Sequence, residues 1–594
     1  MKIRRDTVRI GAQLQGPLVN REPTMRNDEI ASVFDEIADM LELGGENFFR
    51  VRAYRNAART VRDYPEQVAA LSREKLEEIP GIGADLADKI ATLAATGDLP
   101  LRAELKGSFP AGLLDLRNVG GLGPKRIRLL AERLHIRNRE DLRRAAEAGQ
   151  LRTIRGFGPK LEERIVKSLV HTVEEAAHRM QYAEAALTAN DLIAHLRGCA
   201  QVKRVEVAGS FRRRRDTVGD LDVLVAASEA EPSIRRFLEF PGVTNKLGAG
   251  ETKATVVIGD KLQVDLRVVP RASWGAALVY FTGSKAHGVH IRRIAQTHGL
   301  LLNEYGLFRG ERAIAGAEEG DIYEALGMDW VPPELREDRG EVEAALEHRL
   351  PALLQRSDLR GDLHTHSTWT DGRATIREMA RRAAASGLEY FAVTDHSQRL
   401  TMVHGLDSER LREQAREIEA VGAKVSGIKV LRGIEVDILE DGTLDLPDGV
   451  LEELDWVVAS VHSKLEQETS AMTRRLVRAI RNPNVDVIGH PSGRLIGRRE
   501  ASGFDLREVL RAAHEEGCAL EVNAQPDRLD LIDTACMAAK RAGVKVVISS
   551  DAHHPHDFAA LEYGVNQARR GWIEPSDVLN TRPLNELRQR GSRL

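Results

Sequence analysis

Seven short apolar runs after residue 357 each end in side chains that can bind a metal ion. In a parallel α/β barrel the carboxyl ends of the strands meet on one face, so these side chains would lie close together. Imidazole and carboxylate groups that outnumber the needs of one ion indicate a polynuclear hydrolytic centre. The runs are DLHTHS (His364, His366), YFAVTDH (Asp395, His396), VLRGIEVD (Glu435, Asp437), WVVASVH (His462), VDVIGH (His490), ALEVN (Glu521, Asn523) and KVVISSDAH (Asp551, His553).

Composition narrows the class of protein. A chain of 594 residues with 42% hydrophobic and 30% charged residues is typical of a soluble protein of three to four domains. It has no apolar run of membrane-spanning length and no signal-peptide core, which predicts a cytoplasmic protein without a membrane partner. Three cysteines without a CxxC pair argue against disulfides and thiolate zinc sites. The histidines, ten of 18 after residue 357, are therefore the metal-capable group.

The net charge of −4 is unevenly distributed. Residues 101–170 hold 16 Lys and Arg against 8 Asp and Glu, whereas 431–460 hold one Arg against nine acids. This asymmetry favours phosphate contacts in the front half and cation binding behind, although an ordinary solvated surface is the alternative.

Local patterns divide the chain. Residues 1–24 lack periodicity and are interpreted as a disordered arm or an extension before a natural start at Met25, which opens an amphipathic helix. Helical patterns continue to about residue 200, where strands begin to alternate with helices. Residues 331–357 contain a Pro-Pro break and a charged helix, as expected of a connector, and a second strand–helix alternation follows.

An internal repeat has the form apolar-x-Gly-apolar-Gly before a helix. It occurs in IPGIGADLADKI, VGGLGPKRIRLL and IRGFGPKLEERI. Paired glycines leave backbone N–H groups free at a helix N-terminus, which suits a phosphate. One copy could be a plain helical turn, but three copies resemble the helix-hairpin-helix motif, which binds the DNA backbone without reading sequence. The expected DNA-binding residues are Gly81, Gly83, Gly121, Gly123, Lys125, Gly156, Gly158 and Lys160, with Arg126 adding charge.

Three aspartates indicate a phosphoryl-transfer site. Asp220 and Asp222 lie two apart on an expected strand, so their carboxylates point to the same face. Asp265 interrupts the apolar pattern of LQVDLRVV, expected to be a neighbouring strand. Carboxylates gathered in this way need cations, and two Mg²⁺ or Mn²⁺ ions would form a clamp for in-line transfer. A hairpin turn with exposed acids is the alternative, but it leaves Asp265 unexplained.

These motifs, followed by YFTGSKAH and LLNEYG, resemble family X DNA polymerases. The resemblance implies that Asp220, Asp222 and Asp265 are the catalytic, metal-binding residues. It also implies a nucleotide site formed by Gly209, Ser210, Arg213, Tyr280, Phe281, Gly283, Lys285 and Arg292, with Arg292 on the template side. Lys285 and Gly288 replace an acid and an asparagine of animal members, so contacts to the base would differ.

The N-terminal part resembles the lyase domain of the same family. Lys89 occupies the position of the Schiff-base lysine and Tyr54 that of a nearby aromatic residue. Asp85 and Asp88, however, place negative charge beside Lys89, which favours its ammonium form over a nucleophilic amine. A catalytic Lys89 and a surface lysine that contacts DNA both remain open.

The rear barrel resembles the PHP (polymerase and histidinol phosphatase) domain. The resemblance implies a trinuclear site of nine residues: His364, His366, Asp371, His396, Glu435, His462, His490, Asp551 and His553. Glu435 would bridge two ions, the first completed by His364, His366 and Asp551 and the second by His462 and His490, while Asp371, His396 and His553 would hold the third. Such ions make hydrolysis of a phosphodiester possible near neutral pH. Arg494 could hold substrate phosphate.

Together the resemblances imply a bacterial or archaeal family X polymerase with a C-terminal PHP domain. The implied fold is multidomain: an all-α helix-hairpin-helix region, an α+β nucleotidyltransferase palm with a small C-terminal subdomain, and a (β/α)7-type barrel. The expected divisions are an extension (1–24), a lyase-like domain (25–108), a DNA-binding region (109–185), the palm and nucleotide-selection subdomain (186–335), a linker (336–357) and the PHP domain (358–594).

The implied function is short-gap filling in DNA repair, with a 3′–5′ exonuclease that could also act as an abasic-site endonuclease or 3′-phosphoesterase. The expected partners are gapped or primed DNA and dNTPs, with the protein a monomer. The cofactors would be Mg²⁺ or Mn²⁺ in the palm and up to three ions in the barrel, where the ligands suit Mn²⁺, Zn²⁺ or Fe²⁺. Two other hypotheses are a DNA-end-binding scaffold with a weak polymerase, and a small-molecule phosphatase fused to a nucleotidyltransferase.

Overall fold

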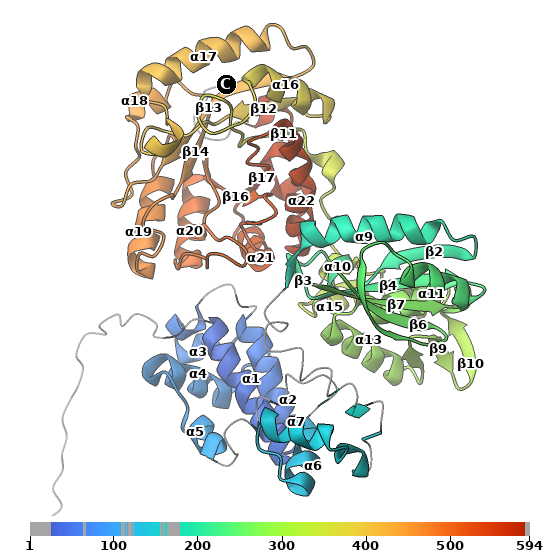
Figure 1. The fold of residues 1–594 in the computed structure, drawn as a ribbon. Helices are drawn as coiled ribbons and strands as arrows, with labels where there is room; N and C mark the ends of the chain where they lie inside the picture. The colour runs from blue at the N-terminus through green and yellow to red at the C-terminus, as the bar shows by residue number, and fades with distance from the viewer. Residues whose placement is uncertain are drawn as a thin grey trace, which may run out of the picture. The chain divides into compact units, whose positions relative to one another are not determined.

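The computed structural model describes most of the chain after the first 24 residues. Contacts between Cα atoms divide the chain into two compact units, Met1–His171 and Thr172–Leu594, and each is described by itself. The predicted multidomain class is confirmed: a helical unit is followed by a mixed sheet and then by a parallel barrel (Figure 1). The described residues are 27–62, 67–107, 124–154, 179–259 and 261–587, with Met25, Tyr64, Leu113, Leu116, Leu122, 157–158, 161–162 and Ile165. The interpretation of residues 1–24 falls outside them.

The first unit is helical. The amphipathic pattern predicted after Met25 forms α1 (Asn27–Gly44), whose apolar face packs on α2 (Phe48–Arg62). Phe34 and Tyr54 meet edge to face in this core, with ring centroids 5.8 Å apart. The helices that follow are α3 (Arg73–Glu77), α4 (Ala84–Thr96), α5 (Pro100–Gly107), α6 (Pro124–Leu134) and α7 (Arg139–Glu147).

The second unit begins with a five-stranded mixed sheet in the order β2-β4-β7-β6-β5. Only β4 and β7 run parallel, and their register places Asp222 directly opposite Asp265. The alternation of buried and exposed residues along these strands matches the period of two that the sequence shows. The elements are α9 (Tyr182–Arg197), β2 (Val202–Val207), α10 (Gly209–Arg212), β4 (Asp220–Ala227), α11 (Ala230–Leu238), β5 (Val243–Ala249), β6 (Lys253–Ile258) and β7 (Leu262–Val269).

A small subdomain follows the mixed sheet. Its helices pack around a core of their own, which includes the buried side chains of Val279 and Tyr323. A three-stranded antiparallel sheet in the order β10-β9-β8 completes it. The elements are α12 (Trp274–Thr282), α13 (Lys285–Thr297), β8 (Leu301–Asn303), β9 (Gly306–Arg309), β10 (Arg312–Ala315) and α14 (Glu319–Ala325).

The segment predicted to be a linker is packed rather than loose. Arg336 and Glu341, the latter at the start of α15 (Glu341–Leu346), are both completely buried. Glu341 accepts hydrogen bonds from the backbone N–H groups of Asp338 and Arg339 and faces His287 Nδ1 at 2.7 Å. Charged residues looked solvated in the sequence, but these have buried partners that lie elsewhere in the chain.

Seven parallel strands in the order β11-β12-β13-β14-β15-β16-β17 form the predicted barrel. Beyond the ends of the first and last strands, a parallel bridge between Thr365 and Ala552 brings the two edges together. The strands are β11 (Gly361–Asp362), β12 (Tyr390–Val393), β13 (Lys429–Asp437), β14 (Trp456–Ser460), β15 (Val487–Ile488), β16 (Ala519–Asn523) and β17 (Val546–Ser549). The helices between and after them are α16 (Ile376–Ala385), α17 (Ser408–Gly422), α18 (Asp448–Leu451), α19 (Thr469–Ile480), α20 (Leu506–Glu516), α21 (Asp533–Arg541) and α22 (Leu561–Arg570).

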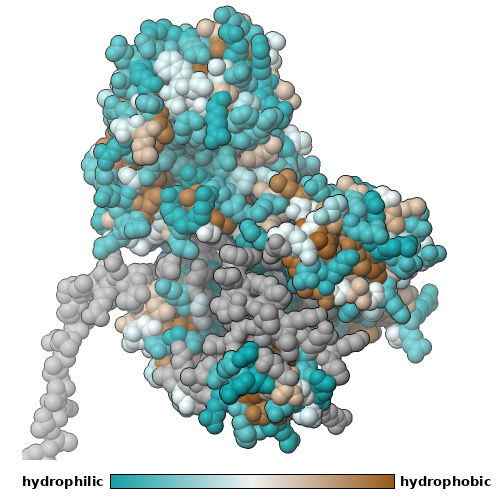
Figure 2. All heavy atoms as spheres, viewed as in Figure 1, coloured by the Kyte–Doolittle hydropathy of each residue, from teal (hydrophilic) through white to brown (hydrophobic). Residues whose placement is uncertain are grey.

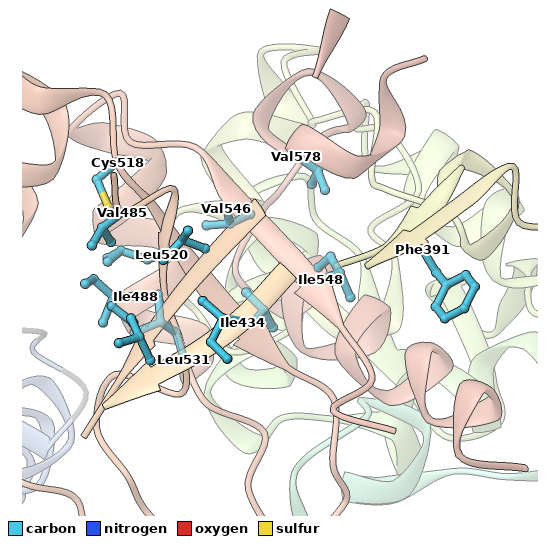
Figure 3. Packing of buried hydrophobic residues seen from close by; sticks show 14 of the residues in the cluster. Phe391, Ile434, Val485, Ile488, Cys518, Leu520, Leu531, Val546, Ile548 and Val578 are labelled. Carbon is cyan, nitrogen blue, oxygen red and sulfur yellow. The ribbon is translucent and has the colours of Figure 1, made fainter. Parts of the chain in front are cut away.

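Alternate residues of the barrel strands belong to two separate apolar cores. Phe391 and Ile434 pack in the larger core toward the surrounding helices, which Figure 3 shows from close by. Tyr390 and Leu431, one strand position away, fill a second core with Trp456. Because both faces of each strand are covered, the strands read as continuous apolar runs in the sequence. The packed barrel holds the strand ends, and the side chains that follow them, in fixed positions.

A buried ion-pair network joins the mixed-sheet part to the barrel. Glu337 accepts hydrogen bonds from Arg213 Nε and from Arg570 Nη1 of α22, both at 3.1 Å. Arg570 Nη2 also donates to Asp533 at 2.6 Å, and Asp533 in turn accepts from Arg339. Burial would raise the pKa of Glu337, but the arginines outweigh it and lower that pKa to about 2. The network is therefore charged, and its partners come from both halves of the unit.

The described surface is mainly polar. Figure 2 shows hydrophilic residues over most of the visible face of the barrel, with apolar residues in scattered patches. Exposed apolar side chains such as Phe49, Leu187 and Met402 come from widely separated elements. Among the described helices, none combines the length and apolar character needed to cross a membrane.

Candidate active sites

Three carboxylates face one another on the mixed sheet. Asp220 and Asp222 project from the same face of β4, and Asp265 lies opposite Asp222 on β7. Burial, followed by repulsion from Asp220 and Asp265, raises the pKa of Asp222 to about 7. Burial and Asp265 also raise the pKa of Asp220. Asp265 is held in place by Thr255 Oγ1 and by Gln263 Nε2, the latter at 2.9 Å.

This repulsion is the observation that fits bound cations. Carboxylates that repel one another, and so raise one another's pKa, favour a bound cation. Hard divalent cations prefer oxygen ligands. Gly209 leaves room beside the trio, because a Cβ atom there would collide with Asp222 Oδ2, and its φ of +62° also favours glycine. The residues present therefore suit one or two divalent ions.

The proton on Asp222 makes metal affinity depend on pH. The pKa of about 7 in the folded protein lies above the ordinary value of an aspartate, so the ion-free carboxyl group is protonated below pH 7 and must release its proton when an ion binds. We expect Mn²⁺ affinity at this site to rise by up to about tenfold per unit between pH 5 and 7, and to level off above pH 7. Mn²⁺ titrations would measure this affinity in a variant that lacks the barrel ligands, so that only the site on the mixed sheet binds the ion. Asp222→Asn in the same variant is the control, because it lacks the carboxyl group that titrates. An affinity that is constant from pH 5 to 8 would contradict the assignment.

A pocket of about 700 Å³ adjoins the carboxylates. All eight residues predicted to bind nucleotide line it, together with Asp220 and Asp222. They come from α10 and the residue after it, and from α12, α13 and the turn between them, two regions that are distant in the sequence. The eight are Gly209, Ser210, Arg213, Tyr280, Phe281, Gly283, Lys285 and Arg292. Arg179, Arg215 and Asn303 also line the pocket and were not predicted, although Asn303 lies within the LLNEYG motif.

One wall of the pocket is aromatic. The rings of Tyr280 and Phe281 meet edge to face with centroids 5.0 Å apart, and Tyr280 is 44% exposed. Arg292 lies over the ring of Tyr280 at 5.9 Å, and its Nε donates to the Gly288 carbonyl. An exposed ring beside a cation can stack on a sugar or base.

Arg213 is already bonded within the protein. Its Nη1 donates to the Thr282 carbonyl and its Nε donates to Glu337 at 3.1 Å. The side chain lines the pocket, but it would contact a triphosphate as a shared cation rather than as a free one.

The barrel brings nine predicted ligands together at the carboxyl ends of its strands. Glu435 is central: its Oε1 lies 2.9 Å from His490 Nε2 and 3.2 Å from His462 Nε2. Its Oε2 lies 2.7 Å from His396 Nδ1 and 3.7 Å from His366 Nε2. Four overlapping groups of ligand atoms each lie within 4.8 Å of one another: His366, Asp371, His396 and His553; His364, His490 and Asp551; His364, His366 and Glu435; and His396, Glu435 and His462.

The groups keep His366 with His364 and Glu435, as the family resemblance implies, but two ligands also lie in further groups. His366 lies with the expected third-ion ligands, where its ring stacks on His553 at 4.2 Å. His490 lies with His364 and Asp551 as well as with Glu435. Because the groups share residues, a single contiguous cluster can hold more than one ion.

Burial and neighbouring charges favour the metal-binding protonation states of Glu435 and His366. Burial opposes ionisation of Glu435, but His462, His396 and His364 outweigh it and hold its pKa well below the usual range. Burial, with repulsion from His553 and His396, lowers the pKa of His366 to about 3, so its ring is neutral. A neutral imidazole beside an ionised carboxylate is the form in which both bind metal.

Buried polar atoms without hydrogen-bond partners supply the fit test. In the part of the chain that the structure describes, His364 Nε2, both ring nitrogens of His366, and Glu435 Oε2 accept or donate no hydrogen bond. Such atoms are costly unless something else satisfies them. They converge on one place, so divalent ions suit this donor set, and the cluster is consistent with a multi-metal site.

Comparisons with known proteins agree with this arrangement. Family models match a helix-hairpin-helix domain at residues 25–99, a SAM-like helix-hairpin-helix tandem at 113–170, the DNA polymerase beta thumb at 277–337 and a PHP domain at 362–525. The DNA polymerase/3′-5′ exonuclease PolX of Bacillus subtilis (strain 168) is 36% identical over 567 residues, which cover 95% of this chain and 99% of that protein. The chain belongs to the PolX group of family X DNA polymerases.

Other relatives of this PolX chain match its barrel alone. A probable phosphatase of Thermoanaerobacter sp. (strain X514) is 34% identical over 232 residues, which cover 37% of the chain and 89% of that protein. A probable phosphatase of Vibrio campbellii is 30% identical over 235 residues, which cover 37% of the chain and 88% of that protein.

The strand-end groups that the sequence left without a role hold the ligands of the PolX barrel. Glu521 Oε1 lies 2.7 Å from His364 Nδ1, and Asp437 Oδ1 lies 3.0 Å from His462 Nδ1. Asn523 Nδ2 donates to Asp551 at 3.0 Å. These partners fix the ring orientation and leave the opposite nitrogen for an ion. Asp395 accepts hydrogen bonds from Ser367, Thr370 and Gln414 and so fixes the turn that carries Asp371.

Loss of one such partner should weaken metal binding without abolishing it. We expect Glu521→Gln to lower the affinity of the barrel for Mn²⁺ by about 10- to 100-fold, since the carboxylate also accepts the His490 amide at 2.6 Å. Metal content after dialysis against graded chelator would measure the change. Glu515→Gln, an exposed site on α20, is the matched control. Equal metal retention in the two variants would contradict this role.

Arg494 does not point toward a free phosphate site. Its guanidinium donates to the carbonyls of Arg528 and Leu529 and to Asp216 of the mixed-sheet part at 3.1 Å. The sequence placed it correctly after a barrel strand, but its partners come from other segments that the local pattern does not reveal. Arg528, whose Nε lies 3.9 Å from Asp551 Oδ2, is the arginine beside the ligand cluster.

The predicted lyase lysine lies in a pocket of about 470 Å³ with Tyr54, Asp85 and Gly83. Lys89 Nζ is paired with Asp85 and lies 5.7 Å from the Tyr54 ring centroid. The ion pair engages the Lys89 amine within the protein.

Part of the helix-hairpin-helix prediction falls on described residues. Gly81 has a φ of +87°, and Gly83 is the N-cap of α4, so the first repeat forms a tight turn into a helix. In the third repeat Gly158 precedes the helical turn at Leu161. Gly121, Gly123, Gly156 and Lys160 lie outside the described residues, and the structure does not describe the side chain of Lys125.

Proposed function

We propose that this protein fills short gaps in DNA by two-metal nucleotidyl transfer and trims 3′ ends by hydrolysis in its barrel. The observation that carries the proposal is the presence of two separate metal-suited centres in one PolX chain: the trio on β4 and β7 and the cluster around Glu435. The first suits phosphoryl transfer to a primer, and the second suits attack by water.

In the polymerase site, Asp220, Asp222 and Asp265 would hold Mg²⁺ or Mn²⁺. When bound, such ions activate the primer hydroxyl and neutralise charge on the phosphates. Ser210 and the backbone after Gly209 offer donors to the triphosphate, and Arg213 adds charge. The exposed ring of Tyr280 offers a surface for the sugar and base. Lys285 and Gly288 at the same pocket leave base recognition different from that of animal relatives.

In the barrel, the nine clustered side chains would hold Mn²⁺ or Zn²⁺, up to three ions. When bound, such ions activate water and neutralise the phosphodiester. Glu435 places two oxygens among five histidines, and Glu521 and Asp437 orient the rings. Arg528 adds a cation beside Asp551, which would face the phosphodiester.

DNA would be held by backbone contacts rather than by base recognition. The turn through Gly81 and Gly83 presents N–H groups at the start of α4, as phosphate contacts require. We assign the same role to the glycines and lysines of the second and third repeats. The proposed substrates are therefore gapped or primed DNA and dNTPs. We also propose that the protein acts in the cytoplasm as a monomer.

The barrel-only relatives favour a second activity at the same centre. Their printed description is that of probable phosphatases, and they match 37% of this chain. A 3′-phosphate at a damaged DNA end is a monoester that the same cluster could hydrolyse. Release of inorganic phosphate from a 3′-phosphorylated primer would distinguish this activity from trimming alone.

The test is a gapped-DNA assay with and without dNTPs, in Mg²⁺ and in Mn²⁺. We expect wild type to extend the primer when dNTPs are present and to shorten it when they are absent. Asp265→Ala should lose extension and His364→Ala should lose shortening. Binding of gapped DNA without either reaction would favour the scaffold hypothesis. Hydrolysis of small phosphomonoesters with no attack on DNA would favour the metabolite phosphatase.

A further inference from the structure

A basic pocket lies beside the metal cluster of the barrel. It has a volume of about 430 Å³ and is lined by Arg373, Arg381, Arg382 and His554. Glu378 is the one acid among the described residues that line it. Three guanidinium groups against one carboxylate give the pocket a net positive charge.

The carboxylate of Glu378 is largely used within its own helix turn. It accepts hydrogen bonds from the Thr375 backbone N–H at 2.9 Å and from Thr375 Oγ1 at 2.8 Å, which together form a capping box. Arg381 is near enough to interact with it electrostatically. The acid therefore offsets at most one of the three arginines.

Two of the arginines are uncompensated. Among the described residues, neither the Arg373 nor the Arg382 guanidinium has a hydrogen bond or an ion pair to the protein, and Arg382 Nε is buried without a partner. Arg373 and Arg381 are exposed and Arg382 is half-buried, so an anion from solution can reach all three. A guanidinium binds a phosphate with two parallel hydrogen bonds. The pocket has the chemistry of a phosphate-group site.

The pocket and the metal cluster share two backbone segments. The Arg373 N–H donates to the His553 carbonyl at 2.6 Å, and His553 Nε2 lies 3.3 Å from Asp371. Arg373 follows Asp371 by two residues, a chain distance of at most about 7 Å. His554, which lines the pocket, directly follows the ligand His553.

We infer that this pocket binds a backbone phosphate of the DNA strand being trimmed, next to the phosphodiester that lies at the metal cluster. The inference rests on the proposed exonuclease function and adds to it a second contact with the substrate. A phosphate contact carries no sequence information, so it would hold any strand in register for the removal of successive nucleotides. A mononucleotide product carries the same phosphate chemistry, and the test separates the two sources.

The test compares a double variant, Arg381→Gln/Arg382→Gln, with Arg377→Gln on two substrates. Arg377 is an exposed arginine of the same helix that does not line the pocket. The substrates are a single-stranded oligonucleotide and thymidine 5′-p-nitrophenyl phosphate, a small diester that lacks a neighbouring phosphate. For each substrate, kcat/KM of the double variant is compared with that of wild type. We expect the loss on the oligonucleotide to exceed the loss on the small diester by about tenfold for each guanidinium removed. The plot of log affinity for the oligonucleotide against log salt concentration should also become shallower, by about 0.7 in slope, because one phosphate contact is lost.

Each outcome is decisive. A double variant that matches Arg377→Gln in kcat/KM and in salt slope overturns the inference, as does an equal loss on both substrates. Weaker inhibition by thymidine monophosphate with an unchanged KM for the oligonucleotide assigns the pocket to the product and also overturns it. A wild-type protein that cleaves neither substrate refutes the proposed exonuclease itself. Metal content and melting temperature, measured in parallel, exclude loss of the fold.

Discussion

Glu435→Gln should abolish the 3′–5′ exonuclease while leaving gap filling within about twofold of wild type. Glu435 is almost completely buried, and its two oxygens contact five histidines from four different segments. Removing one partner from a buried charge cluster costs about 3–5 kcal/mol, which corresponds to a loss of about a thousandfold in affinity or rate. Primer shortening without dNTPs and primer extension with dNTPs would be measured on the same gapped duplex.

The matched control is Glu452→Gln, an exposed glutamate of the same barrel. It should retain both activities and the full metal content. An exonuclease that survives in Glu435→Gln, with its metal still bound, would show that the cluster is not the hydrolytic centre. A parallel loss of extension would show instead that the barrel variant is misfolded, which its melting temperature would reveal.

Asp222→Asn should abolish nucleotide incorporation, by about a thousandfold or more, because it removes a fixed charge from the site where the transferred phosphate is neutralised. Exonuclease activity should persist, since the barrel ligands lie on other strands. Single-nucleotide incorporation on a one-nucleotide gap would measure the first effect, and shortening of the same primer would measure the second. Asp191→Asn, an exposed site on α9, is the control.

The same substitution should stabilise the ion-free protein. Folding raises the pKa of Asp222 to about 7, so the charged carboxylate opposes folding. This effect grows as pH rises from the ordinary pKa of an aspartate toward 7. In EDTA, Asp222→Asn should therefore melt at a higher temperature than wild type at pH 8, with a smaller difference at pH 5. A lower melting temperature at pH 8 would contradict the repulsion between the three carboxylates.

Much of both sites could be predicted because regular structure fixes where side chains point. Strand-end residues of a parallel barrel meet at one face, so His364, Glu435 and Asp551 could be grouped from their positions in seven apolar runs. The period of two along strands placed Asp220 and Asp222 on one face. The family resemblance supplied the ligand assignment and the pocket residues, which spacing alone would not have given.

What could not be predicted depends on partners that are distant in the sequence. Nothing local to Arg494 indicates that Asp216 accepts one of its hydrogen bonds, and nothing local to Arg336 indicates complete burial. Glu521 and Asp437 were visible as polar strand ends, but their contacts with His364 and His462 require the register of neighbouring strands. Arg382 lies in an ordinary helical pattern, and its unpaired nitrogen emerges only from packing.

The ion-pair network around Glu337 limits how this enzyme can be divided. Cutting the chain before the barrel would remove Arg570 and Asp533 and leave Glu337 and Arg339 without these partners. Arg213, which lines the nucleotide pocket, would then donate to Glu337 without competition from Arg570 of α22. A truncated polymerase is thus a chemically altered protein, and its nucleotide affinity is not a measure of the intact one.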